Sequence, residues 1–138
     1  MTGFLVRLPP VVLVALGSGA GAVARVAVLE SSRGAERAWL ATTLVNVVGC
    51  LLAGFLYAWA HGGAHLDRQR LAWVALAITG FCGGYTTFSG FGIETANLLG
   101  RGQLGIAIGQ LWIALLVAIF AGRAGIGLAR RLGVAPPP

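Results

Sequence analysis

The segment Gly80-Phe81-Cys82-Gly83-Gly84-Tyr85-Thr86-Thr87-Phe88-Ser89-Gly90-Phe91 lies inside an uncharged apolar stretch, Leu71 to Ile93, that is long enough to cross a bilayer. It combines several glycines with the hydroxyls of Thr86, Thr87 and Ser89. Backbone at membrane depth must satisfy its own hydrogen bonds, so an interrupted helix is tolerated there only where protein covers it or where it lines a cavity. In transporters, such breaks direct helix ends and free carbonyls toward ions. The segment therefore predicts a membrane helix that is broken midway and a role in ion handling.

The composition around this segment is that of a membrane protein. Of 138 residues, 57% are hydrophobic and 10% are charged, which is unlike a soluble globular domain. Apolar runs predict four membrane spans, at about residues 10–29, 39–60, 71–98 and 104–130. We therefore expect residues 1–138 to form a single all-α membrane domain of four helices, with the third helix broken.

The net charge of +6 comes from arginine alone, since the sequence contains no lysine. Most arginines lie near span ends, where they contact lipid headgroups and mark topology. With four spans, one side of the membrane would carry Arg7, Arg68, Arg70, Arg130 and Arg131, and the other Arg33, Arg37 and Arg101. This weak bias leaves the orientation open. No basic stretch carries interleaved aromatics, so we expect no nucleic-acid partner.

The sequence offers no catalytic constellation, and we do not expect an enzyme. No Ser/His/Asp set, carboxylate cluster or phosphate-binding loop is present. A proton-coupled carrier usually needs a carboxylate inside the membrane, and no acidic residue is central to a predicted span. Glu94, at the far end of the third span, is expected to pair with an arginine or to face headgroups.

Three polar or aromatic features inside the spans allow two interpretations each. Asn46 offers two amide donors to an anion, or it bonds a neighbouring helix. Arg25 shares one helix face with Gly17 and Gly21, which favours an anchoring role beside a close helix crossing over direct ion contact. Phe88 and Phe91 would present positively polarised ring edges to an anion, or pack in the core. Thr86 and Thr87 are candidates to cap the helix that follows the break.

These residues resemble the Fluc (CrcB-type) fluoride channel family. Three motifs carry the resemblance: Gly17-x-x-x-Gly21-x-x-x-Arg25, Thr43-Leu44-Val45-Asn46-x-x-Gly49, and the glycine-rich segment from Gly80 to Phe91. Together they cover the first three spans, and the last motif is highly specific. The resemblance implies an antiparallel, dual-topology dimer in a bacterial inner membrane, with two fluoride pores and one central structural sodium ion.

The resemblance also assigns roles to residues of this sequence. Asn46 would donate to fluoride, Phe88 and Phe91 would offer ring edges, and Ser89 and Thr87 would supply nearby hydroxyls. The carbonyls of Gly83 and Thr86 from both subunits would hold the sodium ion. Arg25, Gly17, Gly21 and Gly49 would be structural. The implied function is passive, fluoride-selective export that protects the cell.

Two positions depart from the family pattern. Gly90 stands where a hydroxyl residue is common, and Leu104 to Gly122 of the fourth span hold only Gln110 where the family usually has serine or threonine. One pore of a homodimer would then be poor in donors, so a heterodimer with a paralogous subunit is as consistent with the sequence as a homodimer. The alternatives to a channel are a small dual-topology multidrug exporter and a non-transporting membrane assembly subunit.

Overall fold

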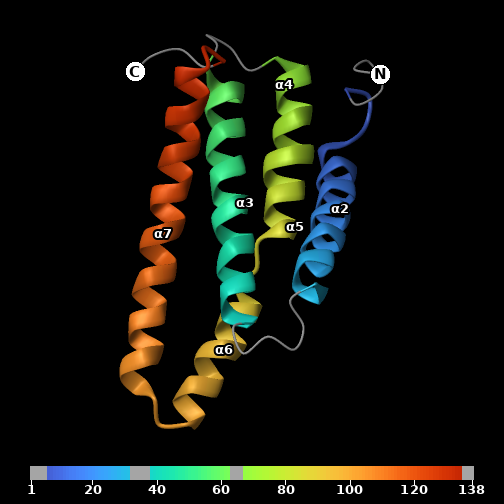
Figure 1. The fold of residues 1–138 in the computed structure, drawn as a ribbon. Coiled ribbons are helices and arrows are strands. Elements are labelled where there is room, and N and C mark those ends of the chain that lie inside the picture. Colours follow the sequence, from blue (N-terminus) through green and yellow to red (C-terminus); the bar gives the residue numbers. More distant parts are fainter. Residues whose placement is uncertain (1–5, 32–37, 63–66, 135–138) are drawn as a thin grey trace.

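The computed structural model describes residues 6–31, 38–62 and 67–134, and none of these residues belongs to a β-strand. Three crossings are continuous helices: α2 (Pro10–Glu30), α3 (Ala38–His61) and α7 (Leu104–Arg131). The third crossing is divided into α4 (Arg68–Trp73), the π-helix η1 (Val74–Cys82), α5 (Gly83–Tyr85) and α6 (Ser89–Gly100) (Figure 1). Each of the four crossings is long and apolar enough to span a membrane. The prediction of an all-α, four-span fold with a broken third helix is thus confirmed. Arg33 and Arg37 lie outside the described residues.

The helix ends follow from local sequence. Pro10 opens α2, where the missing N–H of proline would have had no helical partner. The Asp67 carboxylate caps α4 by accepting a hydrogen bond from the backbone N–H of Arg70 at 2.7 Å. Between α6 and α7 the chain turns through Gly102, whose φ of 71° favours glycine. The turn is short, so α6 and α7 run in opposite directions (Figure 1).

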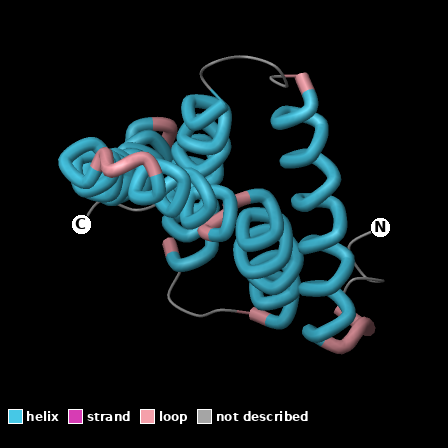
Figure 2. The backbone as a smooth tube through the Cα atoms, turned by 90° about the horizontal axis from the view of Figure 1, so that it is seen from below, coloured by secondary structure: helices cyan, strands magenta, loops and turns pink. Residues whose placement is uncertain are grey.

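The helices pack chiefly as two close pairs, α2 against η1 and α3 against α7. Seen along the bundle in Figure 2, α2 stands well apart from α7. Glycines make both pairs possible, because a Cβ at Gly21 would meet the backbone of Phe81 and a Cβ at Gly125 would meet that of Leu51. Small residues allow such close helix approach in membranes. Glycine contacts therefore determine which helices of the subunit lie close together.

The π-helix η1 was not predicted from the sequence. Its nine residues, Val74–Cys82, are followed by the three residues of α5 and then by the break. π-helical turns are rare and occur often at functional sites. Over so short a stretch of mostly apolar residues, no hydrophobic period separates a π-helix from an α-helix.

Candidate functional site

The first half of the third crossing ends at Thr86, whose backbone is extended with φ of −72° and ψ of 156°. Both the backbone N–H and the side-chain hydroxyl of Thr86 donate to the carbonyl oxygen of Cys82, at 3.0 and 2.9 Å. The second half begins at Ser89. The helix is therefore interrupted over Thr86–Phe88, within the glycine-rich segment.

Asn46 of α3 holds this interruption in place. Its side-chain Nδ2 donates to the carbonyl oxygen of Thr87 at 3.0 Å, and its Oδ1 accepts from the backbone N–H of Thr87 at 2.8 Å. A backbone segment at membrane depth thereby exchanges helical hydrogen bonds for bonds to a side chain. An amide nitrogen carries two hydrogens, so one N–H of Asn46 remains after the bond to Thr87.

Thr87 caps the helix that follows. Its hydroxyl accepts from the backbone N–H of Gly90 at 3.2 Å and lies 3.1 Å from the hydroxyl of Ser89. Thr87 is 7% exposed, so this cap is buried. Of the two threonines expected as caps, only Thr87 takes the role, because Thr86 bonds back to Cys82.

The same bonds release two backbone carbonyls from the helical pattern. In an α-helix the carbonyl of residue i accepts from the N–H of residue i+4. The Thr87 N–H, which would serve Gly83, is bonded to Asn46, and the Gly90 N–H, which would serve Thr86, is bonded to Thr87. Gly83 and Thr86 are thus among the residues at the break whose carbonyl oxygens lose their helical N–H donor.

Phe88 and Phe91 lie together but differ in environment. Their ring centroids are 6.0 Å apart, with 42° between the ring planes. Phe91 is 8% exposed, whereas Phe88 is 81% exposed and projects from the subunit. Spacing alone places both rings on one helix face. The difference arises because Phe88 precedes the first turn of α6 and is not covered by a neighbouring helix of this chain.

A cavity of about 400 Å³ adjoins the break, and we call it the break cavity. Its polar lining comes from Thr42, Thr43, Asn46, Thr86 and Thr87, and Phe88 and Phe91 also line it. No charged residue is among the described residues that form its wall. It brings together four of the five predicted pore residues. Ser89, the fifth, contacts Thr87 without lining the wall.

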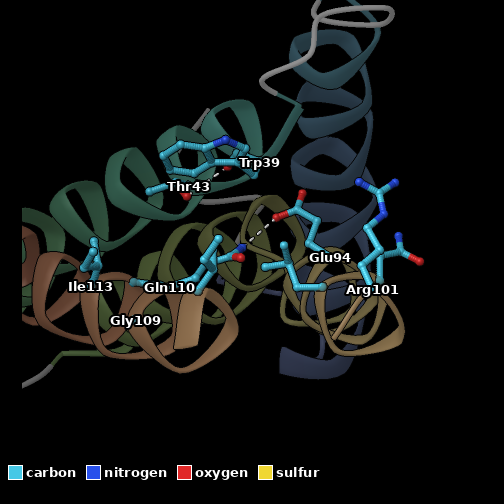
Figure 3. A pocket seen from close by; sticks show the side chains of 11 residues that line it. Trp39, Thr43, Glu94, Arg101, Gly109, Gln110 and Ile113 are labelled. Carbon is cyan, nitrogen blue, oxygen red and sulfur yellow. Dashed lines mark hydrogen bonds between the residues drawn. The ribbon is translucent and has the colours of Figure 1, made fainter. Parts of the chain in front are cut away.

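A second cavity, of about 590 Å³, lies toward the α6–α7 turn, and we call it the end cavity. It shares Thr43 and Ala114 of its wall with the break cavity, so the two cavities adjoin along α3 and α7, and we call the pair the groove. Its lining includes Glu94, Gln110 and Arg101 (Figure 3).

Glu94 has different partners from those expected. The hydroxyl of Thr42 donates to Oε1 at 2.8 Å, and Nε2 of Gln110 donates to Oε2 at 3.1 Å. Glu94 therefore pairs with neutral donors and not with an arginine. Sequence reasoning missed this cluster, because its three residues come from three separate crossings. The one available signal was the polar Gln110 in an otherwise apolar fourth span.

The residues predicted to be structural are not among those that line the two cavities, although Gly49 lies against Thr86 of the break-cavity wall. A Cβ at Gly17 would meet the backbone around Leu76 and Gly80, and one at Gly49 would meet the side chain of Thr86. Arg25 lines neither cavity, and its buried Nε has no hydrogen-bond partner among the described residues.

Comparison with known proteins gives a consistent result. The family model described as "CrcB-like protein, Camphor Resistance (CrcB)" matches residues 12–126. The chain is 40% identical over 124 residues to the fluoride-specific ion channel FluC of Gloeobacter violaceus, covering 88% of this chain and 96% of the relative. It is 36% identical over 111 residues to FluC of Francisella tularensis subsp. mediasiatica, covering 79% and 85%, respectively. FluC of Coxiella burnetii is 36% identical over 124 residues, covering 88% and 98%.

Proposed function

The chain belongs to the CrcB-like family, and from this premise we propose that it is a subunit of a fluoride-specific ion channel. It is a multi-pass membrane protein, with four helices that can span the bilayer. We further propose that it lies in a bacterial inner membrane and lets cytoplasmic fluoride leave passively. The matches favour this function over a multidrug exporter or an assembly subunit.

The observation that carries the proposal is the uncharged polar wall of the break cavity. Fluoride is small and strongly hydrated, so a selective path must replace its water with donors. Asn46 retains one amide N–H, and the cavity wall also carries the hydroxyl of Thr87. Neutral donors supply positive potential without a fixed charge that would trap the ion.

The aromatic rings complete this proposed path. Phe88 and Phe91 line the break cavity, and the edge of an aromatic ring carries positive potential that can face an anion. Since Phe88 is 81% exposed in the single subunit, its ring is free to contact a partner subunit. We propose that fluoride passes between these rings and the donors of α3.

We also propose that Gly83 and Thr86 hold a structural sodium ion. Sodium prefers hard oxygen ligands, and these two residues have carbonyls whose helical donors are bonded elsewhere. Gly83 is exposed, and a Cβ there would meet nothing within 4 Å. Two carbonyls from one subunit leave a coordination shell incomplete, so a second subunit would supply the rest. When bound, the ion would neutralise the converging helix ends.

The proposed assembly is an antiparallel dimer with two pores. Its partner is either a second copy or a paralogous subunit, and one observation favours the paralogue. The fourth helix, Leu104–Arg131, contains no serine, threonine or tyrosine, so it cannot provide a hydroxyl to either pore. A paralogue with hydroxyls in its last helix would restore those donors.

Reconstitution in liposomes tests the proposed function. The purified chain, alone and with a paralogue from the same genome, is placed in vesicles under a potassium gradient, and valinomycin starts the efflux. We expect rapid fluoride efflux that needs valinomycin, with no matching chloride flux. Vesicles without protein give the leak. If neither the chain alone nor the mixture carries fluoride, the channel function is wrong.

The sodium proposal has its own measurement. The melting temperature of the purified oligomer is compared in sodium and in N-methylglucamine buffers of equal ionic strength. Because a ligand that binds only the assembled state stabilises it, sodium should raise the melting temperature. Equal stability in both buffers would contradict a structural sodium ion.

A further inference from the structure

The end cavity contains two opposite charges that do not pair. Glu94 and Arg101 both line it, yet no ion pair links these two described residues. Figure 3 shows the Glu94 carboxylate directed toward Gln110, with Arg101 on its other side. An arginine and a glutamate that line the same cavity attract each other. The absence of an ion pair between them therefore requires an explanation.

Two hydrogen bonds explain it. Each carboxylate oxygen of Glu94 accepts one bond, from Thr42 on α3 and from Gln110 on α7. Thr42 is 5% exposed, so its donor is fixed inside the protein. The carboxylate is therefore held from both sides by helices on which Arg101 does not lie.

Arg101 itself is exposed at the α6–α7 turn, at the end of the bundle opposite the chain termini (Figure 1). No hydrogen bond or ion pair joins its guanidinium to another described residue. From this end the groove runs through Thr43 to the break cavity and Asn46. An unpaired cation thus stands at one mouth of the groove, where it attracts anions.

On the basis of the fluoride conduction proposed above, we propose that Arg101 raises the local concentration of fluoride at the mouth of the groove. Gln110 and Thr42 are positioning residues, because their hydrogen bonds keep Glu94 from pairing with Arg101 and neutralising its charge. A charge at the rim of a low-dielectric cleft raises the local concentration of the opposite ion and the rate at which it enters. A Glu94–Arg101 ion pair would cancel that effect. Gln110 would then serve the path indirectly in a fourth helix that has no hydroxyl.

The test measures initial fluoride flux in proteoliposomes at low fluoride concentration. Flux is compared at about 10 mM and about 1 M salt, where the Debye length is about 30 Å and about 3 Å. We expect Arg101→Gln to lower flux about threefold to tenfold in low salt and by less than about twofold in high salt. Arg101→Lys should stay near wild type. Arg68→Gln removes an exposed charge outside the groove and is the matched control.

Gln110 is tested by rescue. Gln110→Met keeps the side chain's length but removes its donor, which frees Glu94 to approach Arg101, so flux in low salt should fall. Adding Glu94→Gln removes the competing charge and should restore much of that flux. A residue that only packs would show no such rescue. Size-exclusion profiles confirm that each variant remains assembled.

The outcomes separate the two proposals. If the wild-type protein carries no fluoride, the channel function fails and the role of Arg101 falls with it. If the wild type conducts, equal flux for Arg101→Gln and wild type in low salt overturns the gathering role alone. An equal loss in Arg68→Gln would assign the effect to overall charge and also overturn it. Absence of rescue in the double variant overturns the positioning role of Gln110.

Discussion

The Asn46 side chain bonds both backbone polar groups of Thr87 and leaves one amide N–H outside these bonds, which we propose faces the anion. Asn46→Asp preserves an acceptor for the Thr87 N–H but removes both donors and adds negative charge beside the path. A hydrogen bond to a charged group contributes about 1.5–3 kcal/mol, so flux should fall at least about tenfold. The measurement is fluoride efflux from liposomes.

The control for this change is Thr43→Val, one turn earlier on α3. The Thr43 hydroxyl already donates to the carbonyl of Trp39 at 2.9 Å, so its loss should affect flux less than the loss of the Asn46 amide. Unchanged flux in Asn46→Asp would remove Asn46 from the pore.

Phe88 offers a second test at the level of one side chain. Its ring is 81% exposed in the subunit, so Phe88→Ile should leave the subunit folded. Conduction should slow because a ring edge is replaced by an alkyl group without positive polarisation. Flux is measured together with the oligomeric state. Loss of the dimer, with conduction per assembled dimer unchanged, would show that Phe88 only packs.

Single residues show where sequence reasoning ends. The type and spacing of Asn46, Thr86 and Thr87 were enough to select them. Their roles were not determined by spacing, because the choice of Thr87 as the cap depends on a bond between α3 and the break. Glu94 was assigned the wrong partner for the same reason. Its donors are 52 and 16 residues away in the chain.

At the scale of the helices, glycine contacts decide which surfaces meet. Gly21 of α2 lies against Phe81, whereas a Cβ added at Gly19 on the same helix would meet nothing within 4 Å. Gly21→Ala should push α2 from the third crossing, and overpacking typically costs about 1–3 kcal/mol. We expect a lower melting temperature, measured as the loss of the size-exclusion peak after heating. Gly19→Ala, the matched control, should melt like wild type, and equal melting of both variants would contradict this packing.

Some features of the helices could be predicted from the sequence, and others could not. Apolar run length predicted four crossings, and the glycines with hydroxyls predicted the break. The i, i+4 spacing of Gly17 and Gly21 predicted a close crossing, which the structure assigns to η1. The second close pair joins α3 and α7, where a Cβ at Gly54 would meet Gly122 and one at Gly125 would meet Leu51. Ala121, Gly125 and Ala129 of α7 are buried at i, i+4 and i+8, a small-residue spacing that the sequence prediction did not use. The contacts of this pair become visible only when both helices are placed together.

For the whole molecule, the placement of α7 changes the charge balance between the two ends. Arg123 is exposed and lies 19 positions after Leu104, or about 28 Å along the helix axis. The hydrocarbon core is about 30 Å thick, so Arg123 lies near its far boundary. It joins Arg7, Arg68, Arg70, Arg130 and Arg131 at the end that carries both termini (Figure 1). The excess of arginines at this end is therefore larger than the excess counted from the sequence without Arg123.

This asymmetry predicts that most copies insert with both termini in the cytoplasm, because arginine-rich ends are retained there. C-terminal fusions to a cytoplasmic fluorescent reporter and to a periplasmic phosphatase measure the orientation. We expect strong fluorescence and weak phosphatase activity. Replacing Arg123, Arg130 and Arg131 by glutamine should make the two signals more equal. If the orientation is fixed, an antiparallel dimer requires a paralogue that inserts in the opposite orientation. Equal signals from the wild-type chain would contradict the prediction and would allow a homodimer.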